Sequence, residues 1–154
     1  MLDRTLLGGP STSPLGAMRA SLRLGLLRGG GAALISLGLV HTVATPHIAT
    51  LIRRSTTAAV AEWLTPPMLL NHVLVGVLLI PLGYLTVYAA PHSVRGASWA
   101  QIIVRTVSVS AASLPIALFS LMGTPYFLDA PLFVLGAALT VVVVLVLLAA
   151  AFSK

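Results

Sequence analysis

Four long apolar stretches constrain this chain more than any other feature, because each is close to the length that crosses a bilayer. A helix needs about 20 apolar residues to span roughly 30 Å of hydrocarbon. The stretches cover residues 31–52, 68–90, 102–122 and 131–152. We therefore expect an all-α, polytopic membrane protein with four transmembrane helices, preceded by a flexible basic tail over residues 1–30.

The composition agrees with lipid as the surrounding medium. Only 8% of the 154 residues are charged, whereas soluble domains carry about 25%. A chain this short has a large surface for its volume and would need many more polar side chains in water. The net charge of +6 does not indicate a nucleic-acid partner, since the arginines flank apolar stretches instead of forming a stripe interleaved with aromatics.

The tail before the first stretch has its own pattern. Gly, Pro, Ser and Thr dominate residues 1–16 and indicate a flexible segment. In residues 17–28, Arg19 and Arg23 lie one helical turn apart, and the apolar side chains lie on a different face. We interpret this segment either as a short interfacial helix or as a basic extension of the first membrane helix.

Residues that commonly start, cap or end helices support these boundaries. Thr65-Pro66-Pro67 predicts the start of the second helix, Pro91 predicts its end, and Asp129 predicts the cap of the fourth. The outer connection, residues 53–66, is expected to hold a short surface helix. Aromatic side chains near the boundaries are typical of a membrane interface; they are Trp63, Trp99, Tyr84, Tyr88, Tyr126 and Phe127.

The basic residues predict the orientation, because cytoplasmic loops carry an excess of Arg and Lys. With the N-terminus inside, seven basic residues face the cytoplasm and only Arg53 and Arg54 lie outside. We expect both termini in the cytoplasm. Abundant Ala, Gly, Arg and Val with a single lysine is typical of a high-GC source, so a bacterial cytoplasmic (inner) membrane is expected. The cytoplasmic residues are Arg4, Arg19, Arg23, Arg28, Arg95, Arg105 and Lys154.

Three histidines are the candidate cofactor-binding residues, because ionisable groups inside a membrane are rare and commonly functional. On the expected boundaries, His47 and His72 lie at a similar depth on consecutive antiparallel helices, with His41 as the substitute partner. Facing imidazoles can ligate haem b or hold copper or zinc. The alternative is structural hydrogen bonding across helices. In that alternative the histidines bond to Asn71, Thr42 or Thr45. The fourth histidine, His92, is expected to be solvated in a loop.

No catalytic set of side chains is present. The acids Asp3, Glu62 and Asp129 lie near segment ends, so acid–base chemistry lacks its usual carboxylates. The absence of cysteine excludes thiolate nucleophiles and thiolate metal sites. Gly29-Gly30-Gly31 lacks the lysine of a phosphate-binding loop. We expect no catalytic residues.

Small residues in the third stretch form the clearest packing pattern. Their spacings of four, three, four and three put them on one helix face, where they allow close backbone approach and hydroxyl bonds. Gly76 and Gly83 in the second stretch are expected to form the matching seam. We interpret the face as bundle packing or a subunit contact. Its members are Thr106, Ser110, Ser113, Ala117 and Ser120.

Two short motifs resemble a loose group of small four-helix bacterial membrane proteins of unknown function. They are Gly38-Leu39-Val40-His41 and the glycine-bearing run from Gly76 through Gly83. The resemblance covers about half of the chain and implies an architecture without an assigned activity. The arginine-bearing N-terminal extension departs from that pattern.

Three functions follow as hypotheses. The first is a non-catalytic accessory subunit or self-associating bundle, with a homo-oligomer or a larger membrane complex as its partner. The second is a redox subunit that binds haem b or a metal. The third is a small transporter or channel, lined by carbonyls that Pro46, Pro81 and Pro115 free from helical bonding.

Overall fold

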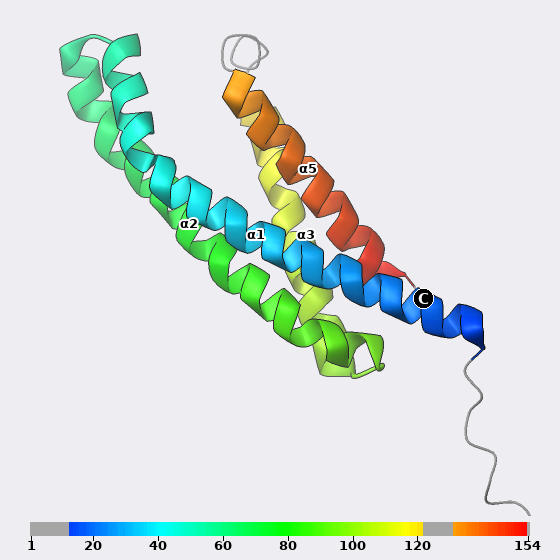
Figure 1. The fold of residues 1–154 in the computed structure, drawn as a ribbon. Helices are drawn as coiled ribbons and strands as arrows, with labels where there is room; N and C mark the ends of the chain where they lie inside the picture. Colours follow the sequence, from blue (N-terminus) through cyan, green and yellow to red (C-terminus); the bar gives the residue numbers. More distant parts are fainter. Residues whose placement is uncertain (1–12, 122–130, 154) are drawn as a thin grey trace, which may run out of the picture.

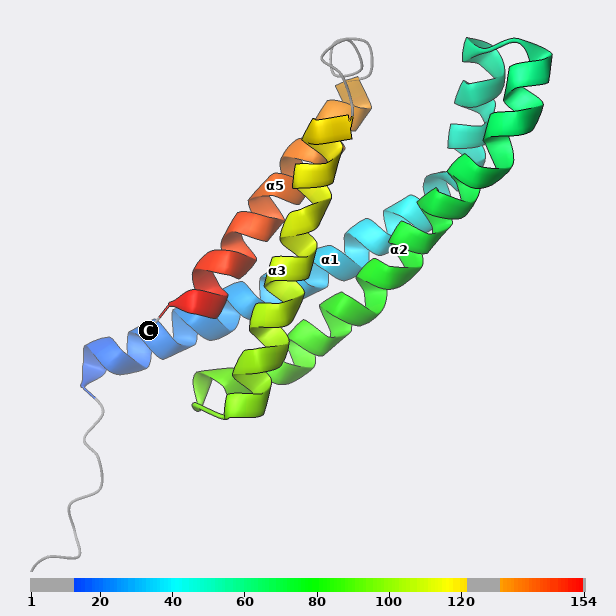
Figure 2. The same cartoon turned by 180° about the vertical axis from the view of Figure 1, so that it is seen from behind.

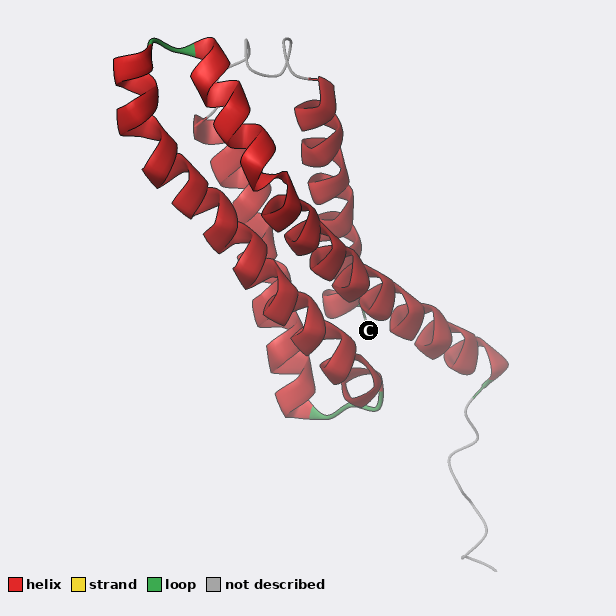
Figure 3. Cartoon of the chain, turned by 60° about the vertical axis from the view of Figure 1, so that its left-hand side comes forward, coloured by secondary structure: helices red, strands yellow, loops and turns green. Residues whose placement is uncertain are grey.

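The structure is a computed structural model that describes residues 13–121 and 131–153. Within these ranges the chain forms four helices, and all four are long and apolar enough to span a membrane (Figure 1). Figure 3 shows short loops joining helices and no strand in the part of the chain it describes. The all-helical class and the four candidate spans are therefore confirmed. The helices are α1 (Pro14–Ser55), α2 (Ala58–Val94), α3 (Ser98–Leu121) and α5 (Pro131–Phe152).

The helices are arranged as a ring. The backbone of α1 lies next to that of α2, α2 next to α3, α3 next to α5, and α5 next to α1, whereas the backbones of the two diagonal pairs lie further apart among the described residues. Figures 1 and 2 show the α1–α2 hairpin diverging from the α3–α5 pair toward the Thr56–Thr57 turn. The two pairs therefore meet most closely at the opposite end, where α5 finishes beside the first half of α1.

Glycines set the distance between α1 and α2. A Cβ atom added at Gly38 would lie 2.6 Å from the carbonyl oxygen of Gly76, and one added at Gly31 would lie 2.8 Å from that of Gly83. Both separations are shorter than real Cβ contacts, so no other residue fits without a shift. The glycines are seven apart on each helix, which brings the same face into contact twice. The expected seam at Gly76 and Gly83 thus matches α1, because α1 carries its own glycine pair, and not the small face of α3.

The core lies between the four helices and is built from branched and small apolar side chains. One cluster joins all four helices through leucines and valines, with Leu34, Leu79 and Leu147 buried at its centre. A second cluster lies nearer the C-terminal end of α5 and is rich in alanine, including Ala89 and Ala100. Small side chains there let the helices converge, as leucine and valine do not.

Helix α1 begins at Pro14 and not near residue 31. The Ser13 side chain caps it by accepting a hydrogen bond from the Gly16 amide at 3.2 Å, and Pro14 occupies the first turn, where its missing N–H costs nothing. Residues 14–30 therefore continue into the first span as one helix, which is the extension interpretation of the basic segment. Residues 1–12 lie outside the described residues.

The outer connection differs from the expectation. It consists of the Thr56–Thr57 break between α1 and α2, so the expected surface helix is instead the first part of α2. Thr65-Pro66-Pro67 lies inside α2 and does not start it, and the Thr65 hydroxyl donates to the Ala61 carbonyl at 2.6 Å. The two prolines are exposed near the hairpin tip, where carbonyls left without a helical partner can be reached by solvent.

The prolines inside the spans do not end their helices. Helix α2 continues past Pro91 to Val94, and Gly96, with a φ of 90°, makes the turn into α3. Pro46, Pro81 and Pro115 also lie inside continuous helices, so they do not break the spans into halves. Helix α5 has the expected bounds. Asp129, Tyr126 and Phe127 fall outside the described residues.

The lengths of the helices are unequal. Helices α1 and α2 have 42 and 37 residues, or about 63 and 56 Å at 1.5 Å per residue. Helices α3 and α5 have 24 and 22 residues, or about 36 and 33 Å. Only the second pair matches a hydrocarbon layer of about 30 Å. In a membrane, α1 and α2 would have to tilt or extend past that layer.

We expect Gly38→Ala to destabilise the fold by about 1–3 kcal/mol, because the added methyl group meets the Gly76 backbone. Gly29→Ala is the matched control, since a Cβ there meets nothing within 4 Å and alanine favours a helix by about 1 kcal/mol over glycine. Equilibrium unfolding in mixed micelles measures both. Equal destabilisation by the two variants would contradict the close α1–α2 contact.

Candidate functional site

Two histidines from α1 and α2 lie against each other. The ring centroids of His41 and His72 are 4.7 Å apart and the ring planes are inclined by 32°. The two residues are equally far along the chain from the Thr56–Thr57 turn, and each lies about one helical turn from a glycine of the close contact. A Cβ added at Gly76 would lie 3.1 Å from the Cβ of His41. The close approach of the two helices at Gly38 and Gly76 therefore places the two imidazoles in contact.

The ring nitrogens of this pair are incompletely bonded. The Nδ1 atom of His41 lies 3.1 Å from the Leu37 carbonyl oxygen of its own helix. With the proton on Nδ1 it donates to that oxygen, and Nε2 keeps a free lone pair. The Nε2 atom of His72 is buried and has no hydrogen-bond partner among the described residues. A buried nitrogen that makes no hydrogen bond carries a desolvation cost.

The prediction that His47 lies opposite His72 was wrong. His47 is exposed on α1, and the contact is made by His41. The depth match between His47 and His72 assumed that α2 begins at residue 68. Because α2 begins at Ala58, the hairpin turns earlier and His72 comes level with His41.

The expected hydrogen bonds between the histidines and Asn71, Thr42 or Thr45 are not formed among the residues that the structure describes. Thr42 donates to the Gly38 carbonyl and Thr45 to the His41 carbonyl, each at 3.0 Å and within α1. Asn71 is exposed. None of the hydrogen bonds found in the described part of the chain joins these three side chains to a histidine ring, so they do not explain the buried His72 nitrogen.

The separation of the rings limits what they can hold. Two imidazoles on one tetrahedral ion have centroids roughly 5 Å apart, given metal–nitrogen bonds of about 2.0–2.1 Å. Axial ligation of haem needs roughly 6 Å and room for the porphyrin between the rings. The observed 4.7 Å is closer to the separation for a small ion than to the separation for a haem. Among the described residues no third His, Cys, Asp or Glu joins the pair.

The small face of α3 points away from the core. All five members, from Thr106 to Ser120, are exposed, whereas the buried side of α3 carries Val104, Val107 and Ala111. The face therefore does not pack inside this chain, because α3 turns its branched apolar residues toward α2 and α5 instead. The interpretation as a subunit contact stays a prediction.

A group of polar contacts at the end of α5 was not anticipated. The Arg23 guanidinium donates from Nε to the Ala150 carbonyl at 2.9 Å and from its terminal nitrogen to the buried Ser93 hydroxyl at 3.4 Å. Arg105 approaches the Ala151 carbonyl at 3.5 Å and lies 5.4 Å from the Phe152 ring centroid. Arginines stabilise the carbonyls at a helix C-terminus. The position of Arg105 inside an apolar stretch was the available sequence signal.

His92 is not a solvated loop residue. It lies in the last turn of α2, where its Nδ1 contacts the Arg95 guanidinium at 3.1 Å. Its ring centroid is 5.1 Å from Trp99 and 6.0 Å from Tyr88. This aromatic group at the end of α2 agrees with the expected interfacial aromatics.

We found no family model, no characterised protein and no solved structure that matches this chain. The function therefore rests on the residues and their geometry.

The histidine pairing can be tested by crosslinking, because the chain has no cysteine of its own. We expect a variant with His41→Cys and His72→Cys to be joined within one chain by a short thiol-specific linker, detected by mass spectrometry. The matched pair His47→Cys and His72→Cys should remain unlinked under the same conditions. Faster linking of the second pair would contradict the register of α1 and α2.

Proposed function

We propose that this chain is a non-catalytic integral membrane protein that self-associates, or joins a larger membrane complex, through the exposed small face of α3. The observation that carries the proposal is that every member of this face lies outside the four-helix ring. The proposed role is structural: the chain presents a helix surface on which a second helix can dock.

The physical chemistry of lipid supports this role. Lipid tails are as apolar as leucine, so helices in a bilayer associate through van der Waals contact and hydrogen bonds. Small side chains make few van der Waals contacts with lipid, but they allow the backbone of another helix to come close. The Ser113 hydroxyl already donates to the Ser110 carbonyl at 2.6 Å, so its polarity is compatible with an apolar surface. A second copy of α3 would form a self-complementary contact of two-fold symmetry.

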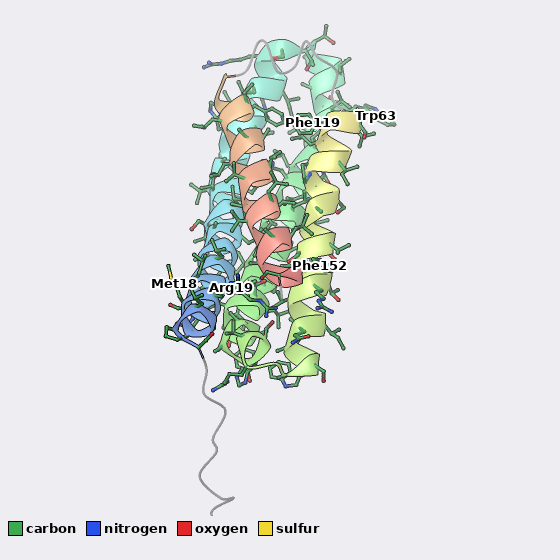
Figure 4. All side chains as sticks on the ribbon, turned by 90° about the vertical axis from the view of Figure 1, so that its right-hand side faces the viewer. Met18, Arg19, Trp63, Phe119 and Phe152 are labelled. Atoms are coloured by element: carbon green, nitrogen blue, oxygen red, sulfur yellow. The ribbon has the colours of Figure 1, made fainter. Side chains whose placement is uncertain are left out.

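The distribution of charge supports a membrane orientation with both termini in the cytoplasm. At the end of the ring where α1 begins, Arg19, Arg23 and Arg95 lie on α1 and after α2, and Arg53 and Arg54 close α1 at the other end. Figure 4 shows Met18 and Arg19 at the same end as Phe152, and Trp63 at the opposite end. With the basic end inside, we propose a multi-pass protein of the bacterial inner membrane.

The scarcity of carboxylates supports the non-catalytic part of the proposal. In the described part of the chain Glu62 is the one acidic residue, and it is exposed near the α1–α2 tip. Glu62 lies ten residues before His72 on α2, and it is therefore nearer to the Thr56–Thr57 turn than the histidine pair is. A histidine that acts in acid–base catalysis is commonly oriented by a carboxylate, and none joins His41 and His72 among the described residues.

Self-association through α3 can be measured with a single introduced cysteine. We expect Ser113→Cys to form disulfide-linked dimers in membranes under mild oxidation, because the symmetric contact places two copies of the residue together. Phe119→Cys is the control and should form few, because Phe119 is also exposed on α3 but lies about 140° around the helix from the centre of the face. Equal dimer yields from both positions would argue against this interface.

A second test removes the contact. We expect the combined change Ser113→Leu and Ala117→Leu to convert the oligomer to a monomer in native mass spectrometry, because two bulky side chains prevent backbone approach. Val109→Leu with Ile116→Leu introduces the same number of leucines elsewhere on exposed α3 and should leave the oligomer intact. A monomeric unmodified chain would overturn the self-association.

We also propose a second candidate function, the binding of a divalent transition metal ion between His41 and His72. The buried His72 nitrogen without a partner favours it, and imidazole is a good ligand for zinc, copper and nickel. With two protein ligands in the described residues, water or a second chain would have to complete the coordination shell. This arrangement predicts weak binding in a monomer.

Titration of the purified chain with Zn²⁺ or Ni²⁺ tests this site. We expect His72→Ala to reduce the affinity at least tenfold, since one of two ligands is lost, and His47→Ala to leave it unchanged. A purified chain with a haem absorption band that His72→Ala removes would contradict the preference for a small ion. Identical affinities in all three proteins would exclude the pair as a metal site.

A further inference from the structure

The end of the ring that carries the start of α1 has a groove of about 630 Å³. Its walls come from three helices: the first turns of α1, the end of α2 and the end of α5. Arg19 and Arg23 supply its charge, and Leu22, Leu26 and Val94 supply apolar surface. The groove therefore combines two cations with a hydrocarbon-like wall, which is the combination that an amphiphilic anion requires.

The two arginines differ in how they are held. Arg23 is half-buried and already donates to Ala150 and Ser93, so its guanidinium is fixed while further N–H groups stay available, since arginine has five. Arg19 is exposed and donates none of the hydrogen bonds found in the described part of the chain. One anchored and one open guanidinium, four residues apart on α1, can together contact a phosphate.

No carboxylate competes for these arginines among the described residues of this end. Glu62, the one acid in the described ranges, lies beside the α1–α2 tip at the far end. Charge complementarity therefore favours an anion as the occupant. The surface potential of a cytoplasmic leaflet is also negative, and basic pockets between membrane helices at that face bind anionic head groups.

The first turns of α1 are shaped for the region where head groups meet acyl chains. Leu15, Met18 and Leu22 are 70, 71 and 62% exposed and lie on one face at helical spacing. This face adjoins the one that carries Arg19 and Arg23. A helix with adjoining apolar and basic faces lies in the membrane interface, with its apolar side toward the acyl chains and its arginines reaching head-group level.

We propose that this groove binds an anionic phospholipid, with the phosphate at Arg19 and Arg23 and an acyl chain along Leu22 and Leu26. The site is independent of the α3 contact, because it is formed by α1, α2 and α5. A lipid there would bridge the start of α1 to the end of α5. Its binding is expected to be selective for head-group charge.

Native mass spectrometry of the full chain in detergent tests the proposal, with phosphatidylglycerol and phosphatidylcholine of identical acyl chains as probes. We expect tighter binding of phosphatidylglycerol, and about fivefold weaker binding of it by Arg19→Gln, since one basic residue near a lipid surface contributes about 1 kcal/mol. Arg19 makes no contact that the fold needs. Arg19→Lys should retain most of the affinity because it keeps the charge.

Arg28→Gln is the matched control, since Arg28 is exposed on α1 and does not line the groove. Equal binding of the two lipids, or equal loss in Arg19→Gln and Arg28→Gln, would overturn the proposal. Competition with inorganic phosphate separates the lipid from the free ion. Displacement of phosphatidylglycerol by millimolar phosphate would show a phosphate site and would also overturn it.

Discussion

The close contact between the backbones of α1 and α2 determines most of this structure. At two levels, seven residues apart on each helix, glycine meets glycine, and neither position has room for a Cβ atom. In the bilayer that we propose, apolar burial contributes little to helix association, so stabilisation depends on the number of atoms in van der Waals contact. Two helices that approach this closely form a tightly packed hairpin. Helices α3 and α5 then pack against it through Leu34, Leu79 and Leu147.

The existence of four long apolar helices could be predicted from the sequence because composition reports the surrounding medium. The bounds of α5 were also predictable, since Pro131 and the end of the apolar run mark them. The starts of α1 and α2 were not. Prolines at positions 66 and 67 are strong local signals for a helix start, yet α2 begins at Ala58 and runs through both of them.

The candidate site was predictable by residue type and not by pairing. His72 stood out as an ionisable group in an apolar stretch, but its neighbour depends on where the hairpin turns, and the turn at Thr56–Thr57 has no proline or glycine to mark it. The small face of α3 was visible as a periodic pattern. Whether such a face points inward or outward depends on which side of the helix meets the rest of the bundle, and periodicity alone does not contain that information.

The repeated glycines also fix the sliding position of α1 along α2. A shift by one heptad would align Gly31 with Gly76 but would put Leu69 opposite Gly38 and Leu24 opposite Gly83. A shift the other way would align Gly38 with Gly83 and lose the second glycine pair. Only one alignment brings both glycine pairs into contact, and this favours one offset of the hairpin. The meeting of His41 and His72 is inherited from that offset. A mutation that moved one helix along the other by one turn, about 5.4 Å, would therefore separate the two imidazoles.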